Sequence, residues 1–374
     1  MNKTTRWIIG LIIVLIVIIL GYSGFKTSNV PTQLNPVKIG AILPLTGWGA
    51  YWGLSEQKGV DLAISDLEKS GKKIDIAIED SATDAKQAVT AAQRLISIDN
   101  VDGLIVEFSG PTTAVAPLAY SSKTPFMYDA VVKTVLETNP FALKAYFDIE
   151  KQCGVAVEYF ANHGFNKIAG IIPSLDFSQE CKRGMTTAAD KKGVSISFYD
   201  FVYGENYFNT IITKMKKDSI DAIVPVMYED GALVFYKQKG QLNFKAPIFA
   251  GIAKDAMFTD RIIANTPAQF INGTIFYDQQ VSSDFTARIN KLYPSFTDSD
   301  ILAVAYGYDQ IMYMGRALEK CRKNPECVKN EIIKDKEYKS VISSDGFGSD
   351  RIMSPIPTYQ QFQNGKIEQF DINK

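Results

Sequence analysis

Three large aromatic side chains, Trp48, Tyr51 and Trp52, follow a strand-like apolar run at residues 37–43, in a segment rich in glycine. In an open α/β sheet, ligands bind in the loops just past the carboxyl ends of the strands. These side chains are therefore a candidate wall for a small molecule. The alternative, that they pack against a neighbouring loop, stays open on these residues alone, because a pocket is defined by several converging loops.

Residue types that carry catalysis are sparse in this chain. Its one histidine, His163, stands before Gly164 at an expected helix end, where the helix dipole favours a structural role. The sequence has no G-x-S-x-G motif, no phosphate-binding loop and no Cys-x-x-Cys spacing. We therefore expect neither an enzyme nor a bound metal or cofactor.

Four cysteines, Cys153, Cys181, Cys321 and Cys327, suit an exported chain, in which even numbers of cysteines usually pair. Cys321 and Cys327 enclose the turn-like insert RKNPE, which predicts a local disulfide. Cys153 and Cys181 would then form the second pair. Free buried thiols remain the alternative.

Charge and length exclude some classes of protein. The chain has 374 residues, with 40 Lys and Arg against 41 Asp and Glu, a net charge of −1. No basic stripe provides the long-range field that nucleic-acid binding needs, so we expect no nucleic-acid partner. The length exceeds what a single core usually serves and suits two domains.

The amino terminus carries a membrane signal. Residues 1–6 contain Lys3 and Arg6, and residues 7–25 are uncharged and long enough to cross the hydrocarbon layer. The positive-inside rule predicts that residues 1–6 form a cytoplasmic amino terminus and that residues 7–25 form a transmembrane anchor. Residues 26–36 would then be a polar tether. We expect a single-pass protein of the cell membrane with its binding domain outside. The alternative is a cleaved signal peptide that leaves a secreted or periplasmic chain.

Beyond the tether, short apolar runs alternate with amphipathic segments in two series. We expect the first series to alternate strands and helices at 37–43, 54–69, 74–79, 84–96, 103–108, 112–122 and 124–128. The second series starts on a helix and continues at 151–162, 167–172, 178–191, 194–202, 206–217, 222–226, 229–239 and 247–250. Such alternation predicts an α/β fold with two Rossmann-like lobes built on parallel sheets.

The last hundred residues are not expected to form a third lobe. A strand at 273–277 precedes helices at 283–293, 300–320 and 326–334, which must cover a sheet already built. Residues 344–374 read as a turn-rich hairpin, with Asp345-Gly346 and Asn364-Gly365 as turn signals. We expect lobe 1 to comprise 37–148 and 276–345, and lobe 2 to comprise 149–275 and 346–374. Three crossings between the lobes would make a hinge.

Several stretches resemble the type I periplasmic binding proteins, in particular the branched-chain amino-acid and amide binders of ABC transporters. The resemblance extends from about residue 37 to the end and is carried by VKIGAILPLTG at 37–47, YWG at 51–53, EDSATDAKQAVTAAQRLI at 79–96, APLAYSSKTPFM at 116–127 and YQQFQNGKIEQF at 359–370. It implies a cleft between two lobes that closes on a small polar molecule. It also implies delivery of that molecule to an ABC permease.

The resemblance implies that the loops past the strand ends contact the ligand. In the first lobe these positions include Trp52 and the helix start at 109–113, whose hydroxyls and amides suit an anionic oxygen or merely cap the helix. The candidate ligand residues there are Ser109, Gly110, Thr112, Thr113, Asp129 and Ala130. Asp129 replaces the small hydroxyl residue usual in relatives, and we expect an exposed carboxylate that receives an ammonium group or caps a turn.

In the second lobe, Phe177 and Tyr228 stand where relatives place aromatics that cover the ligand. Amino-acid binders usually carry an acidic residue near Ile252, and this chain has none immediately there. Either Asp129, Glu229 or Asp255 takes over that role, or the ligand is not a standard α-amino acid. We take Tyr228, Glu229 and Ile252 as further candidate ligand residues.

These observations predict an extracytoplasmic solute-binding protein that captures an amino acid, amide or similar ligand and delivers it to the permease subunits of an ABC transporter. The alternative is a membrane-anchored sensing ectodomain. With only about six residues before the anchor, such a sensor would signal through a separate partner protein.

Overall fold

The structure is a computed structural model that describes residues 2, 7, 36–175, 177–342 and 344–374. It divides into two units, residues 1–36 and 37–374, and the fold described below is that of the second unit. The predicted anchor at 7–25 and the tether at 26–36 lie almost wholly outside the described residues. Within the described part of the chain, no helix combines the length and the apolar character that crossing a membrane requires.

The first sheet has five parallel strands in the order β2-β1-β3-β4-β5. The strands are β1 (Val37–Leu43), β2 (Ile74–Asp80), β3 (Gly103–Glu107), β4 (Phe126–Asp129) and β5 (Ala142–Lys144). The helices between them are α2 (Ala50–Lys69), α3 (Ala85–Ser97), α4 (Ser109–Ser121) and the short α5 (Val135–Thr138). Six of the seven residues of β1 are apolar and buried, as expected for a parallel strand covered on two sides, and Lys38 is the exception.

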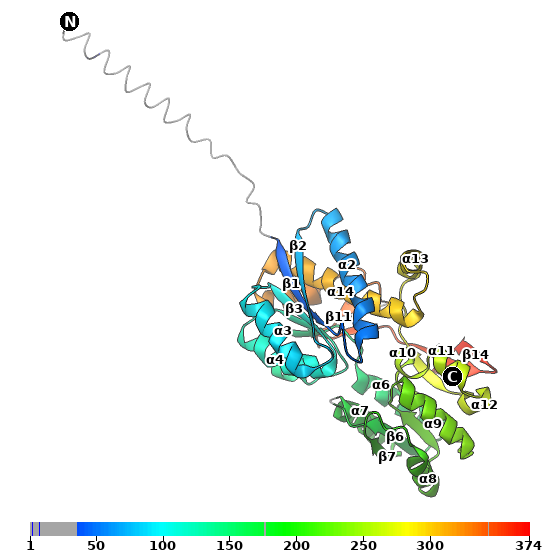
Figure 1. Cartoon of the computed structure of the whole chain (residues 1–374). Helices are drawn as coiled ribbons and strands as arrows, with labels where there is room; N and C mark the ends of the chain where they lie inside the picture. The colour runs from blue at the N-terminus through cyan, green and yellow to red at the C-terminus, as the bar shows by residue number, and fades with distance from the viewer. Residues whose placement is uncertain (1, 3–6, 8–35, 176, 343) are drawn as a thin grey trace. The chain divides into compact units, whose positions relative to one another are not determined.

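Alternate side chains of this sheet enter two separate cores. Ile105 and Met127 pack with α2 and α14 (Asp298–Cys321), whereas Leu104 and Phe126 pack with α3 and α4 on the opposite face (Figure 1). The C-terminal helices α13 (Ser283–Leu292), α14 and α15 (Pro325–Lys334) contribute to the first of these cores. The expectation that these helices cover an existing sheet is confirmed.

The second sheet is built from strands between residues 167 and 369. Strands β7 (Ser195–Phe201), β6 (Lys167–Pro173) and β8 (Ala222–Pro225) form one parallel group, and a bridge from Ile223 to Ile248 joins it to β9 (Phe249–Ala253). Beyond β9 come β10 (Ile275–Asp278), β13 (Thr358–Gln363) and β14 (Lys366–Gln369). Helices α6 (Ile149–Asn162), α7 (Ser178–Lys192), α8 (Asn209–Lys217) and α9 (Glu229–Gln241) contribute to its core.

The chain passes between the two sheets at positions that differ from the expected ones. The first core is the one that the first sheet shares with α2 and α14, and the second core is that of the second sheet. Phe276 is fully buried in the second core, because β10 pairs with β9 and β13. Phe347 and Met353, from the hairpin β11 (Ser344–Phe347) and β12 (Met353–Pro355), pack in the first core. The strands after residue 344 are thus divided, because β11 and β12 pack on the first core whereas the strands from 358 onward extend the second sheet.

One of the two predicted turns in this region is present and the other was wrong. Asn364 and Gly365 connect β13 and β14 with φ values of 51° and 83°, the left-handed conformation that a two-residue hairpin turn requires. Asp345-Gly346 lies inside β11, because the β11–β12 turn comes later, and the N–H of Arg351 donates to the carbonyl of Gly348 there.

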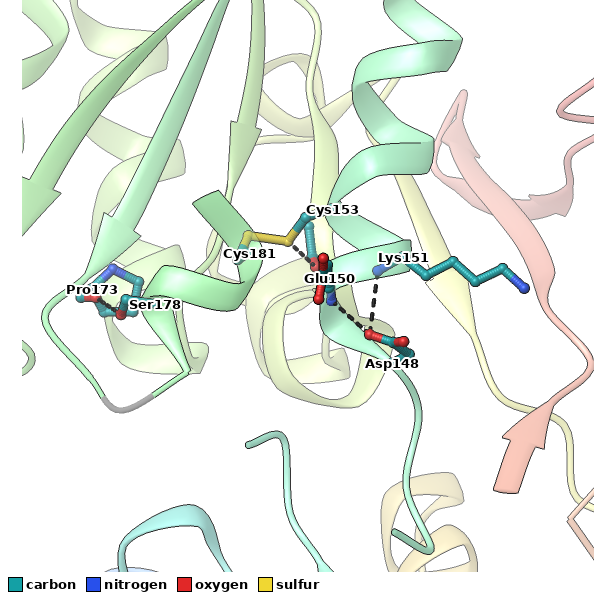
Figure 2. The surroundings of a disulfide bond; sticks show 8 residues. Asp148, Glu150, Lys151, Cys153, Pro173, Ser178 and Cys181 are labelled. Carbon is teal, nitrogen blue, oxygen red and sulfur yellow. Dashed lines mark hydrogen bonds between the residues drawn. A yellow bond between two sulfur atoms is a disulfide. The ribbon is translucent and has the colours of Figure 1, made fainter. Parts of the chain in front are cut away.

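Side-chain caps fix where several helices begin. The Asp84 carboxylate accepts from the amide of Gln87 at the start of α3. The Asp148 carboxylate accepts from the amides of Glu150 and Lys151 at the start of α6 (Figure 2). These caps satisfy amide groups that have no partner within the helix.

Both expected disulfides are present. Cys153 of α6 and Cys181 of α7 are joined 28 residues apart in sequence, and Figure 2 shows the bond between the two helices. Cys321, the last residue of α14, is joined to Cys327 in α15. The second bond pins the turn between these two helices.

Short elements escaped the sequence analysis. They are α5, β5, α10 (Lys254–Met257), α11 (Asp260–Asn265) and α12 (Ala268–Ile271). Each is six residues or shorter, and hydrophobic periodicity needs a longer window to be visible.

Candidate functional site

A cavity of about 1350 Å³ opens where the two cores face each other. Its second-core wall is built at the carboxyl ends of β7, β8, β9 and β10, represented by Tyr203, Tyr228, Lys254 and Asp278. Its first-core wall is built from the segment before and at the start of α2, and from the first turns of α13 and α14. This is the edge of the sheet at which parallel α/β folds bind ligands.

An aromatic cluster of Trp48, Tyr203 and Tyr228 spans the cavity. The ring of Trp48 lies 6.0 Å from that of Tyr203 and 6.4 Å from that of Tyr228, and the two tyrosine rings are 5.6 Å apart, measured between centroids. Trp48 is 54% exposed and Tyr203 is 44% exposed, so the cluster opens to solvent. It joins the loop after β1 to the loops after β7 and β8.

The Trp48 ring rests on a residue with an unusual backbone. The ring centroids of Phe108 and Trp48 lie 4.9 Å apart in an edge-on arrangement. Phe108 has a φ of 67°, a value that a bulky residue adopts at an energetic cost. Its amide donates to the carbonyl of Asp129, which holds this conformation in place. Strain of this kind is concentrated at ligand clamps and active sites.

Acidic side chains dominate the charge of the cavity. Seven of the lining residues are acidic and two are basic, which gives a formal charge of −5. The acidic residues are Glu205, Glu229, Asp230, Asp260, Asp278, Asp298 and Asp300. The basic residues are Lys254 and Arg261.

Both basic side chains already have acidic neighbours. One Arg261 nitrogen donates to Glu229 and to Asp230, at 2.7 Å in each case, and these carboxylates raise the pKa of Arg261 above its usual value. The Lys254 ammonium lies 3.9 Å from the Asp298 carboxylate. Burial raises the pKa of Asp278, and the charge of Lys254 opposes that shift.

The cavity contains two of the predicted ligand residues, Tyr228 and Glu229, together with Trp48, which precedes α2, and Tyr51, in the first turn of α2. Trp52 and Phe177 lie elsewhere. Trp52 is 7% exposed on α2 with its ring 6.4 Å from that of Tyr306, and Phe177 is 2% exposed in the second core.

The predicted loop at 109–113 forms the first turn of α4 and does not line this cavity. The Ser109 hydroxyl oxygen accepts from the Val132 amide at 3.3 Å, and the Thr113 hydroxyl donates to the carbonyl of Ser109. Gly110 is half-buried beside them, and Thr112 is fully buried. These contacts are those of a helix start tied to the neighbouring loop.

Two further candidates are buried, Ala130 directly after β4 and Ile252 within β9. Ala130 is 4% exposed and its carbonyl accepts from the buried Lys144 ammonium. Ile252 is 3% exposed within β9. The side chain of Asp255 lies outside the described part of the structure.

The expectation that Asp129 is exposed was wrong. It is 4% exposed at the end of β4, where β3 and β5 flank it. It belongs to a buried group of carboxyls with Glu56 and Glu107, and burial followed by the charge of Glu56 raises the pKa of Glu107 well above its usual value. None of these three carboxyls lines the cavity.

Tyr203, Asp278 and the acidic first turn of α14 also line the cavity, and none of them was predicted from the sequence. Tyr203 and Asp278 follow strands that were predicted, so the rule that ligand loops follow strand ends was sufficient to find them. The first turn of α14 approaches the cavity only through tertiary packing on α2, which no local pattern reports.

A family described as periplasmic binding protein matches residues 36–355. This range covers most of the chain, and the chain belongs to that family. The family consists of solute-binding proteins rather than enzymes.

Among curated proteins, the chain is 22% identical over 251 residues to the Leu/Ile/Val-binding protein homolog 7 of Brucella abortus, over 63% of this chain and 62% of that protein. It is 25% identical over 234 residues to the Leu/Ile/Val-binding protein homolog 1 of the same organism, over 58% and 60% of the two chains. The match thus spans about three fifths of the length of these relatives.

Solved structures share the fold over a longer range. A leucine-binding protein LivK of Thermotoga maritima superposes with a TM-score of 0.75 at 20% identity, over 90% of this chain and 98% of that chain. The substrate-binding protein LivJ of Streptococcus pneumoniae, solved with isoleucine, gives 0.71 at 20% identity, over 89% and 98%. A solute-binding protein of Rhodopseudomonas palustris, solved with 3,4-dihydroxybenzoic acid, gives 0.72 at 18% identity, over 90% and 98%. The fold is therefore the α/β type I periplasmic binding protein fold.

Proposed function

We propose that the protein is an extracytoplasmic solute-binding protein that captures a small polar molecule in the cavity between its two lobes and delivers it to an ABC permease. The observation that carries the proposal is a cavity of about 1350 Å³ lined by residues from both cores. A small molecule in such a cavity bridges the two walls, so its binding energy favours their approach. Catalytic turnover is not part of the proposed activity.

The proposed lobes follow the hydrophobic cores, two of them on the faces of the first sheet and one on the second sheet. Residues from 37 to about 146, together with residues from about 283 to 355, belong to lobe 1. Residues from about 147 to 278, with those from 358 onward, belong to lobe 2. Three crossings near 146, 280 and 356 form the hinge in this proposal.

The proposed anchor rests on the sequence alone. The uncharged run at 7–25 holds the binding lobes at the outer face of the cell membrane, where a permease is within reach. Intact-mass measurement of the protein from its native membrane tests this step. A mature terminus close to residue 24 means that the segment is a cleaved signal.

A thermal-shift panel tests the proposed binding. The purified full-length chain is heated with leucine, urea, choline, putrescine and benzoate, one compound at a time. A compound present at 100 times its dissociation constant stabilises the folded state by about 2.7 kcal/mol, which raises the Tm by a few degrees for a chain of this size. If no polar metabolite in this panel or in an extended one changes the Tm, the proposal fails.

A further inference from the structure

The charge of the cavity constrains its ligand more sharply than the family does. The lining carries a formal charge of −5. Four helices of ten residues or more, α2, α9, α13 and α14, have their first turns at the cavity, and each N-terminus contributes about +0.5 of an elementary charge. The balance remains at about −3, so the cavity attracts cations and repels anions.

The two basic side chains do not make the cavity favourable for an anionic ligand. Arg261 is held by two carboxylates, and the ammonium of Lys254 lies 3.9 Å from the carboxylate of Asp298 and interacts electrostatically with that of Asp278. A ligand carboxylate that paired with either cation would have to share it with an acidic side chain. It would also enter a site with a surplus of negative charge.

The aromatic cluster supplies a second, independent feature that suits a cation. The centroids of Trp48, Tyr203 and Tyr228 lie within 6.4 Å of one another. A cation placed against this cluster can therefore lie within about 6 Å of more than one ring, the distance over which a ring face attracts a positive charge. Such a cluster, exposed to solvent at Trp48 and Tyr203, suits an organic cation.

We propose that the ligand of this cavity is an organic cation, a quaternary ammonium or amine compound, whose positive group sits against the aromatic cluster of Trp48, Tyr203 and Tyr228 with Asp278 in the surrounding acidic wall. The proposal rests on the proposed solute-binding function and names its ligand class. Cation–π attraction holds the positive group, and the carboxylates neutralise its charge.

The test is isothermal titration of the purified full-length chain with matched probes. Choline is compared with 3,3-dimethylbutan-1-ol, which has the same shape without the charge, and putrescine distinguishes an amine site from a quaternary ammonium site. Leucine and benzoate represent zwitterions and anions. We expect choline or putrescine to bind at least tenfold more tightly than the neutral isostere, leucine and benzoate.

Variants separate the two features. Trp48→Leu keeps an apolar side chain and removes the ring, and Asp278→Asn keeps the hydrogen-bond acceptor and removes the charge. We expect each to weaken binding of the preferred cation at least tenfold. Asp61→Asn, an exposed position on α2 outside the cavity, is the matched control and leaves binding unchanged.

Tighter binding of leucine or benzoate than of any cation overturns the inference and leaves the solute-binding function standing. Equal binding of choline and its neutral isostere also overturns it, because shape alone would then explain affinity. Absence of binding by every probe counts against both the ligand class and the proposed function.

Discussion

The buried carboxyl of Glu56 has an environment that makes the stability of this protein depend on pH. Glu56 is fully buried on α2 and accepts a hydrogen bond of 2.8 Å from the amide of Gln310. Burial raises its pKa to about 7, although hydrogen bonds with Glu107 and Gln310 lower it in part. The folded chain thus keeps a proton that the unfolded chain releases near the ordinary value of 4.5.

This difference sets the sign of the pH dependence. Between pH 4.5 and about 7 the folded chain binds more protons at Glu56 than the unfolded chain, so the free energy of unfolding falls as pH rises. The contribution of Glu56 is fully present below pH 4.5 and is lost at pH 7. We expect Glu56→Gln, measured by Tm at several pH values, to flatten this part of the profile.

The matched control for Glu56→Gln is Glu68→Gln, an exposed residue of the same helix. Its pH profile should follow that of the native chain. An unchanged slope between pH 4.5 and 7 in Glu56→Gln would mean that the side chain is ionised in the folded protein, contrary to this account.

Single residues also mark the limit of sequence analysis. Tyr228 and Glu229 were found because the family resemblance implies ligand contacts past the strand ends, and the strand before them is visible in the sequence. Asp129 was misjudged because burial of a strand end depends on both neighbouring strands, and those are brought together only by the fold. The positive φ of Phe108 had no sequence signal, since neither glycine nor asparagine marks it.

The crossing of α2 and α14 depends on two glycines. A Cβ at Gly59 would lie 1.9 Å from the carbonyl oxygen of Val304, and one at Gly307 would lie 2.3 Å from the carbonyl oxygen of Glu56. Because backbone atoms are the obstacle, the helices must separate to admit a methyl group. The close crossing brings the acidic first turn of α14 to the cavity.

We expect Gly59→Ala to lower the free energy of unfolding by about 3 kcal/mol, at the upper end of overpacking costs. Gly231→Ala in α9 is the matched helical control, because its Cβ meets no atom closer than 3.8 Å. That variant should be neutral or more stable by about 0.5 kcal/mol. Urea denaturation measures both, and equal stabilities of the two variants would contradict the close crossing.

The two disulfides join helices and differ in the length of chain they close. Cys153–Cys181 spans 28 residues and Cys321–Cys327 spans 6. Loop-closure entropy then predicts a loss of about 3.5 kcal/mol for Cys153→Ala with Cys181→Ala, against about 2 kcal/mol for the other pair. Urea denaturation of the two double variants tests this order, and a larger loss for the short loop would contradict it.

At the level of these elements, sequence and structure agree where apolar runs are long. Apart from the short α5 and β5, the alternation of strands and helices from 37 to 250 was predictable because its elements bury a clear face. The hairpin β11–β12 was not, because its packing against the first core and the bridge from Lys144 to Ile352 depend on contacts distant in sequence.

Over the whole molecule, the two proposed lobes also contact each other away from the cavity. The Glu180 carboxylate of α7 accepts from the backbone amides of Lys133 at 2.6 Å and Thr134 at 3.0 Å. Glu180 is 1% exposed, so water does not replace this contact readily. The contact ties the loop after β4 to the second lobe.

Removal of this contact should be visible at the two amides. We expect Glu180→Ala to speed hydrogen exchange of Lys133 and Thr134 at least tenfold, because their acceptor is gone. Glu158→Ala, which removes only a surface ion pair with Lys191, is the control. Unchanged exchange in Glu180→Ala would show that another group protects these amides.

The central claim is that the cavity between the lobes holds a small solute, and it is tested most directly by titrating the purified chain with the compound of the thermal-shift panel that raises the Tm most. The native chain, Tyr228→Ala and Tyr207→Ala are compared by isothermal titration. Tyr207 is an exposed tyrosine of the second lobe outside the cavity. The account predicts at least tenfold weaker binding in Tyr228→Ala and native affinity in Tyr207→Ala. Native affinity in Tyr228→Ala would contradict it.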